Sequence, residues 1–326
     1  MVVNSGCANA VTGEQGLADA VEMAELAAQK TGVLAEEVLT ASTGVIGRRL
    51  PLARIRTGMS RISLTADGGH HLARAMMTTD TVPKEVAIRA DEGRFTIGGV
   101  AKGSGMIHPD LATMLCFLTT DAAVELDFLK VALRRAVDVS FNMLSIDGET
   151  SPNDMVLVMA NGMAGNEPIS PGSPQADVFV QMLSEACLHL AKAIARDGEG
   201  ASKLIEVRVN GAASEAEARR AARTVVSSPL VKAAIHGSDP NWGRIIAAVG
   251  RSGVEVVEAK IDLYLGNVCL VQSGHTLPAD YGEVAAALRG SEVSITVNLN
   301  LGDGAATAWG CDLSEEYVTI NSQYTT

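Results

Sequence analysis

The sequence predicts an α/β protein, and three observations favour that class. Segments with apolar residues at helical spacing alternate with short apolar runs that are typical of strands. Clusters of Gly, Pro, Asn and Asp separate these segments, as turns require. Hydrophobic residues make up 47% of the chain but aromatic residues only 3%, so we expect a core of aliphatic side chains. The 326 residues fit one large domain or two smaller ones.

The amino-terminal third is expected to form a helix, a strand, a second helix and a hairpin. A helix is predicted over residues 14–30, because apolar residues recur at helical spacing and Gly32 follows as a C-terminal cap. Its buried stripe is expected to consist of Leu17, Val21, Ala24 and Ala28. The later elements are expected at 38–43, at 72–77 and at 86–89 with 94–97.

The rest of the chain predicts further strands alternating with capped helices. Helix starts are indicated by cap residues at Asp121, at Ser173 with Pro174 and at Ser214 with Glu217. The helix after Pro174 is expected to bury an apolar stripe made of Phe179, Met182, Leu183, Ala186, Leu190 and Ile194. The strands are expected at 114–118, 155–159, 204–209, 255–265, 267–271 and 292–300, with a hairpin turn at 302–304.

Composition and charge exclude several functional classes. The net charge of -12 and the pI near 5.0 argue against a non-specific binder of nucleic acid or anionic membrane, because such proteins bind through basic surfaces. No basic leader with an apolar core and no run of 18 apolar residues occurs, so we expect a cytoplasmic protein. The five cysteines lack CxxC spacing and the six histidines lack metal-ligand spacing, so we predict free thiols, no metal and no cofactor.

Thr113 is the candidate nucleophile. It lies between a glycine-rich stretch, residues 98–105, which we expect to form a loop, and the apolar run that starts at Met114. A threonine hydroxyl becomes nucleophilic when a base lies beside it, and its own α-amine can be that base once the preceding peptide bond is cut. A β-branched residue at the start of a strand is ordinary by itself, so the surrounding sequence decides the interpretation.

Two other positions suit a polar cleft. The segment Ser42-Thr43-Gly44 ends a strand at a glycine, where a hydroxyl and a backbone N–H could face a cleft, although an ordinary turn explains the same residues. Glu199 lies between two glycines, so its carboxylate could reach a cleft that the backbone also approaches. A solvated loop acid is the simpler interpretation of Glu199 by itself.

The motif around Thr113 resembles the self-processing segment of the ornithine acetyltransferase family, also called the glutamate N-acetyltransferase or ArgJ family. It reads Lys102-Gly103-Ser104-Gly105-Met106-Ile107, then Pro109, then Ala112-Thr113-Met114-Leu115 and Thr119-Thr120-Asp121-Ala122. Similar segments follow the family order at 4–10, 42–47, 77–84, 237–244 and 321–326. The resemblance therefore extends over the whole chain.

The resemblance implies a layered αββα sandwich of the self-processing, DmpA/ArgJ-like type. It implies cleavage between Ala112 and Thr113, which divides the chain into an alpha chain, 1–112, and a beta chain, 113–326. Family members generally carry a further amino-terminal stretch, so we expect the alpha chain to be truncated here. The implied site residues are the nucleophile Thr113, the oxyanion-hole donors Thr43 and Gly44, and the substrate ligands Thr78, Lys102, Thr113, Glu199, Asn321 and Thr326, with Thr79 the alternative to Thr78.

The implied activity is acetyl transfer from N2-acetylornithine to glutamate through an acetyl-Thr113 intermediate, in arginine biosynthesis. A cation at Lys102 could favour the unprotonated Thr113 amine and bind a substrate carboxylate. Some family members also use acetyl-CoA, and the resemblance implies a heterotetramer of two alpha and two beta chains. Two alternatives stay open: a self-processing amide hydrolase or aminopeptidase with water as the acceptor, and an inactive fragment of the family.

Overall fold

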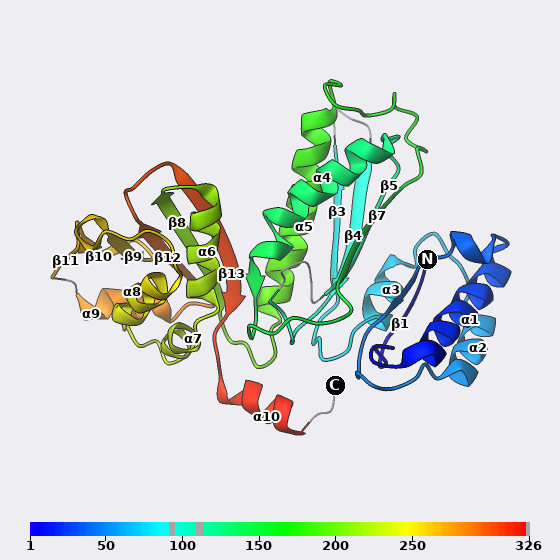
Figure 1. The fold of residues 1–326 in the computed structure, drawn as a ribbon, viewed down its shortest axis with the longest axis horizontal. Helices are drawn as coiled ribbons and strands as arrows, with labels where there is room; N and C mark the ends of the chain where they lie inside the picture. The colour runs from blue at the N-terminus through cyan, green and yellow to red at the C-terminus, as the bar shows by residue number, and fades with distance from the viewer. Residues whose placement is uncertain (91–94, 109–113, 279, 324–326) are drawn as a thin grey trace.

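The computed structural model describes residues 1–90, 95–108, 114–278 and 280–323. It confirms the α/β class, with a two-stranded, a four-stranded and a seven-stranded sheet. Figure 1 shows the two larger sheets side by side, with the long helix α5 (Ala176–Arg196) between them and α1 to α3 on the far side of the four-stranded sheet. The polar site described below lies at one end of the four-stranded sheet.

The four-stranded sheet has the order β3-β4-β5-β7. Its strands are β3 (Lys84–Arg89), β4 (Thr96–Lys102), β5 (Leu115–Thr120) and β7 (Met155–Ala160). Strands β3, β4 and β5 pair antiparallel, whereas β5 and β7 are parallel. Lys102 therefore pairs with Leu115, and Leu115 with Met155, so the end of β4 lies beside the starts of β5 and β7.

The prediction of a glycine-rich loop at residues 98–102 is wrong, because these residues form the second half of β4. Gly99 is covered there by neighbouring side chains: an added Cβ would lie 2.6 Å from a Leu118 methyl group and 3.2 Å from one of Leu190. A glycine in a strand can thus mark a close approach of side chains rather than a loop. Lys102 is consequently the last residue of a central strand.

Helices α4 (Leu126–Asp138) and α5 pack against each other, and α5 contacts strands of both large sheets. The predicted apolar stripe of α5 is confirmed, since Phe179, Leu183 and Leu190 are fully buried. The cap predicted for α4 is wrong, because Asp121 instead accepts a hydrogen bond from the Thr96 amide. By length and composition α5 could cross a membrane, but buried core helices meet the same test.

The seven-stranded sheet has the order β11-β10-β9-β12-β8-β13-β6. In that order its strands are His275–Thr276, Val268–Gln272, Asp262–Leu265, Glu292–Asn298, Leu204–Ala212, Gly304–Cys311 and Leu144–Ser145. Strands β12 and β13 both pair with β8, from opposite sides. The turn at 302–304 therefore joins β12 to β13 across β8, and the predicted hairpin is wrong.

Four helices accompany this sheet: α6 (Glu215–Val226), α7 (Pro229–His236), α8 (Trp242–Arg251) and α9 (Tyr281–Leu288). The cap predicted at Ser214 is confirmed, since its hydroxyl accepts a hydrogen bond from the Glu217 amide. Short 3₁₀ turns occur at Ala35–Glu37, Phe141–Met143 and Glu258–Lys260.

The amino-terminal region pairs β1 (Val2–Asn4) with β2 (Thr40–Ser42) and carries α1 (Gly13–Thr31), α2 (Leu52–Arg61) and α3 (Gly69–Ala75). Gly32 caps α1 in the left-handed conformation, as predicted. The predicted stripe of α1 is partly wrong, because Leu17 and Val21 are exposed. The helix buries its small-residue face instead, around Met23, which lets it approach its neighbours closely.

Candidate functional site

A cavity of about 150 Å³ lies where the amino-terminal region, the end of β4 and the carboxyl-terminal helix α10 (Glu315–Gln323) meet. Six of the residues predicted for the site line it: Thr43, Gly44, Thr78, Lys102, Glu199 and Asn321. Thr79, the alternative to Thr78, also lines it. Ala112, Thr113 and Thr326 lie outside the described residues, but Met114, which follows Thr113 in the sequence, lines the cavity.

Thr43 and Gly44 follow β2 directly. The Thr43 amide donates to the Asn4 carbonyl at 3.1 Å, so the hydroxyl is the Thr43 group that remains for the cavity. Gly44 has φ +127°, and an added Cβ would lie 2.3 Å from the Gly6 carbonyl carbon. Only glycine fits at a position with both this backbone conformation and this close approach.

Lys102 is buried and directs its ammonium group at two threonine hydroxyls. Its Nζ donates to Thr78 Oγ1 at 2.9 Å and to Thr43 Oγ1 at 3.4 Å. Burial lowers the pKa of Lys102; Asp80 opposes this effect and the nearby Lys84 charge adds to it. The ammonium is thus easier to deprotonate than an exposed lysine.

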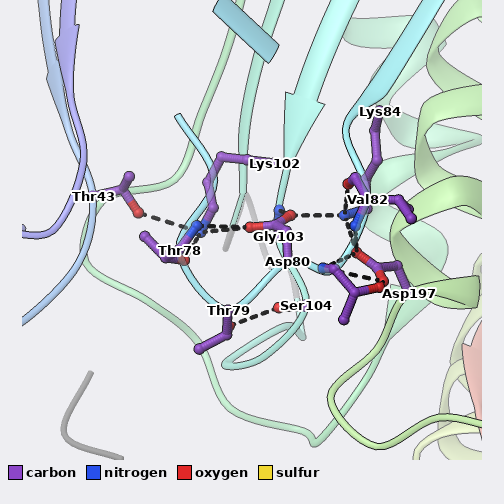
Figure 2. A network of polar contacts seen from close by, with 11 residues as sticks. Thr43, Thr78, Thr79, Asp80, Val82, Lys84, Lys102, Gly103, Ser104 and Asp197 are labelled. Atoms are coloured by element: carbon purple, nitrogen blue, oxygen red, sulfur yellow. Dashed lines mark hydrogen bonds and ion pairs between the residues drawn. The ribbon is translucent and has the colours of Figure 1, made fainter. Parts of the chain in front are cut away.

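Asp80 lies behind Lys102 in a buried polar network, which Figure 2 shows. Its carboxylate accepts hydrogen bonds from Lys84 Nζ at 2.7 Å and from the Gly103 and Thr78 amides at 2.6 and 3.1 Å. Lys102 Nζ lies 4.0 Å from Asp80 Oδ2. Burial raises the pKa of Asp80, but the charges of Lys84 and Lys102 and the hydrogen bonds outweigh it, so the pKa lies below its ordinary value. Asp80 is therefore ionised.

Glu199 is buried in the same cavity as Lys102 and is fixed by two other segments. Its amide donates to the Ser104 carbonyl at 2.7 Å, and its Oε2 accepts from Asn321 Nδ2 at 2.7 Å. Gly105 packs on the carboxylate, since an added Cβ would lie 2.4 Å from Glu199 Cδ. A side chain larger than hydrogen at residue 105 would displace the carboxylate.

Asp154 is a cavity residue to which the sequence analysis gives no role. It lies directly before β7, and Met114 donates a backbone hydrogen bond to its carboxyl group. Its Oδ2 is buried and has no hydrogen-bond partner among the described residues. Burial raises the pKa of Asp154 to about 8, although Lys102 and the backbone hydrogen bonds oppose the shift. Asp154 therefore carries a proton at neutral pH.

Tyr317 on α10 is a second cavity residue that the sequence analysis does not find. Its hydroxyl donates to Asp147 Oδ2 at 3.4 Å, and the Asp147 carboxylate also accepts from the Met106 and Ile107 amides. Burial, with the Asp147 charge, raises the pKa of Tyr317. No pattern in the sequence distinguishes Tyr317 from a surface residue. Asp154 offered one signal, since it precedes an apolar strand just as Thr113 does.

Among the described residues, the cavity combines one buried cation, Lys102, with several hydroxyls and with the carboxyl groups of Asp154 and Glu199. Such a set suits a small zwitterion: Lys102 can bind a carboxylate and Glu199 a positively charged amino group. Among the described residues, no group of three His, Cys, Asp or Glu side chains is arranged to hold a metal ion.

Comparisons with known proteins point to one family. The ArgJ family model matches residues 1–326. The arginine biosynthesis bifunctional protein ArgJ of Dehalococcoides mccartyi is 53% identical over 328 residues, which cover 100% of this chain and 81% of that protein. The ArgJ protein of Symbiobacterium thermophilum is also 53% identical, with 100% and 82% covered. The crystal structure of the ArgJ protein of Bacillus halodurans has a TM-score of 0.64 and 48% identity, over 65% of this chain and 100% of that chain.

Proposed function

The chain belongs to the ArgJ family and is an acetyltransferase of arginine biosynthesis, and from this premise we propose that it moves acetyl from N2-acetylornithine to glutamate through Thr113. The observation that carries the proposal is the cavity. Seven separate segments of the described chain line it, and one of them carries Met114, the residue next to Thr113. The buried cation of Lys102 and the buried carboxylate of Glu199 match the charges of an amino-acid substrate.

The first step of the proposed mechanism is self-cleavage. Thr113 Oγ attacks the Ala112 carbonyl carbon, the amide C–N bond breaks, and the proton passes to the released nitrogen. Water then hydrolyses the ester between Ala112 and Thr113. The products are an alpha chain of residues 1–112 and a beta chain of residues 113–326 with a free amine on Thr113.

The second step is acetyl transfer. The Thr113 amine takes the hydroxyl proton while Oγ attacks the acetyl carbonyl of N2-acetylornithine. The charge that develops on the carbonyl oxygen is stabilised by the Thr43 hydroxyl and the Gly44 amide. Ornithine leaves with the proton, and the amine of glutamate then attacks the acetyl ester. Because ornithine leaves before glutamate reacts, ping-pong kinetics are expected.

The other cavity residues bind the substrate in this proposal. Lys102 binds the substrate carboxylate and keeps the Thr113 amine unprotonated through its positive charge. Glu199 binds the amino group of ornithine, while Thr78, Asn321 and Thr326 complete the set of ligands. Two copies of each chain are proposed to form a cytoplasmic heterotetramer, and acetyl-CoA is the second acetyl donor to test, because the relatives carry the name bifunctional.

Intact mass and amino-terminal sequencing of the purified protein test the proposal. We expect two chains, the second beginning at Thr113, instead of one band of 33.9 kDa. Thr113→Ala should stay uncleaved and inactive, whereas Thr113→Ser keeps a hydroxyl and should cleave.

Labelled acetyl from N2-acetylornithine should appear on glutamate. Release of acetate alone would favour the hydrolase, and a single uncleaved chain without activity would favour an inactive fragment. Acetyl transfer by a folded Thr113→Ala variant would overturn the role of Thr113.

A further inference from the structure

Lys84 is the most deeply buried cation in the described part of the chain and does not line the cavity. Only 1% of its side chain is exposed. Its Nζ lies 2.7 Å from Asp80 Oδ1 and 2.5 Å from Asp197 Oδ2. Two buried carboxylates thus share one ammonium group, as Figure 2 shows. A residue buried at this cost in desolvation needs an explanation.

The two carboxylates contact segments that carry different lining residues of the cavity. Asp80 binds the amides of Thr78 and Gly103, the residue after Lys102. Asp197 binds the Thr81 amide and hydroxyl, and lies two residues before Glu199. Lys84 therefore connects the segment that carries Lys102 to the segment that carries Glu199.

The charges explain where the Lys102 ammonium points. The negative charges of Asp80 and Asp197 are balanced by the positive charges of Lys84 and Lys102. Lys84 Nζ donates to Oδ1 of Asp80. Lys102 Nζ stays 4.0 Å from the other oxygen and donates to threonine hydroxyls in the cavity instead. Without Lys84, the carboxylate of Asp80 would attract Lys102 away from the cavity.

We propose that Lys84 is a positioning residue, which holds the Lys102 ammonium toward the substrate and fixes Glu199 in the same cavity. The inference rests on the proposed roles of Lys102 and Glu199 in substrate binding. It assigns to Lys84 an effect on catalysis that is separate from its effect on folding.

The titration of Lys102 distinguishes the two effects. The titratable groups that face Lys102 are Asp80, Lys84, Asp154 and Glu199. Burial lowers the pKa of Lys102, and Lys84 is the cation among these neighbours that lowers it further. Loss of the Lys84 charge should therefore raise the pKa of Lys102, and a role in folding alone predicts no such change.

The test uses a charge-balanced double variant. Lys84→Met alone leaves two buried carboxylates and is expected to unfold readily. Lys84→Met with Asp197→Asn removes one charge of each sign and leaves Asp80 to face Lys102. We expect this variant to fold, to lose about 10- to 100-fold in kcat/KM, and to shift the titration of Lys102 upward by about one pH unit.

The titration is measured as the pH dependence of cyanate labelling of Lys102, read by mass spectrometry. Lys84→Arg keeps the charge and should keep the wild-type labelling profile. Lys192→Met is the matched control, since Lys192 pairs with Glu206 on the seven-stranded sheet, and should change neither quantity.

A folded double variant with wild-type labelling and wild-type kcat/KM would overturn the inference, as would a Lys84→Arg variant whose labelling shifts as far as that of the double variant. The labelling needs no activity. If the wild-type protein transfers no acetyl, the proposed function fails while the labelling still decides the effect of Lys84 on Lys102.

Discussion

The two walls of the cavity are held in different ways. The wall at the end of β4 carries Lys102 and is supported by Asp80 and Lys84, whose side chains are 0% and 1% exposed. A second wall is formed by α10, which has no buried residue among those described. Figure 1 shows α10 beyond the ends of both sheets. It touches the cavity through Asn321 and Tyr317.

This difference indicates which parts of the site are fixed by folding, before a substrate binds. The wall that carries Lys102, Asp80 and Lys84, called the ionic wall below, cannot rearrange without exposing or separating buried charges. Its geometry is therefore set before a substrate binds. Helix α10 is held by a few hydrogen bonds, such as Asn321 to Glu199 at 2.7 Å and Ser314 to the Gly200 carbonyl at 2.6 Å. Changes in the first wall should affect kcat, and changes in the second mainly KM.

The largest effect is expected from Lys102→Met, which removes the cation of the ionic wall. The substrate carboxylate loses a charge-assisted contact and the Thr113 amine loses the charge that keeps it unprotonated, so kcat/KM should fall by about 10³-fold, with much of the loss in kcat. Steady-state kinetics with N2-acetylornithine and glutamate measure this. Lys130→Met, which alters an exposed pair with Asp127, is the control. A loss below about tenfold would contradict the role of Lys102.

A smaller effect is expected from Thr43→Ala. The Thr43 hydroxyl is a proposed donor to the developing oxyanion, so kcat should fall by about 10²-fold while the melting temperature stays unchanged. Thr43→Ser keeps the hydroxyl and should retain most of the activity. Equal losses in the Ala and Ser variants would instead indicate a packing role for the Thr43 methyl group.

Asn321→Ala tests the α10 wall. It removes the hydrogen bond to Glu199, so KM should rise by about tenfold with a small change in kcat. Because α10 buries none of its described residues, thermal stability should not change. Ser322→Ala, the next residue on the same helix, is the matched control. A drop in kcat equal to that of Thr43→Ala would remove the distinction between the walls.

The smallest effect concerns the pH dependence of stability. The pKa of Asp154 is raised to about 8 by burial. Asp154 keeps its proton in the folded protein at pH values where it has lost the proton in the unfolded chain. The contribution of Asp154 to the free energy of unfolding is therefore full at low pH and is lost as the pH rises toward 8. Asp154→Asn cannot ionise. The difference in melting temperature between this variant and the wild type should therefore shift by about 2 °C in favour of the variant between pH 5 and pH 9.

Asp127→Asn, at a side chain that is 94% exposed, is the control for Asp154 and should show no such trend. A melting temperature for Asp154→Asn that falls relative to the wild type as the pH rises would mean that the folded protein favours the ionised carboxylate. Asp154 would then belong with the charged groups of the ionic wall.

Local patterns predicted elements well where one segment decides its own structure. The stripe of α5 and the caps at Gly32 and Ser214 follow from residues within a few positions of each other. Prediction failed where contact with a segment distant in the sequence determines the local structure or the buried face. Gly98 and Gly99 are typical of a loop, but they lie in a strand because β3 and β5 pair with β4 on either side of them. Leu17 was predicted to be buried, but helical spacing does not show which face of a helix packs against the rest of the protein.

The sequence by itself determined the family, the α/β class and a set of candidate residues, because motif chemistry and periodicity are local properties. Only the tertiary structure decided that Lys102 is buried and that Lys84 joins Asp80 to Asp197, a residue 113 positions away. It also decided that Asp154 lies beside Met114. Desolvation and ion pairing depend on what surrounds a group in space, and the order of residues along the chain does not specify those surroundings.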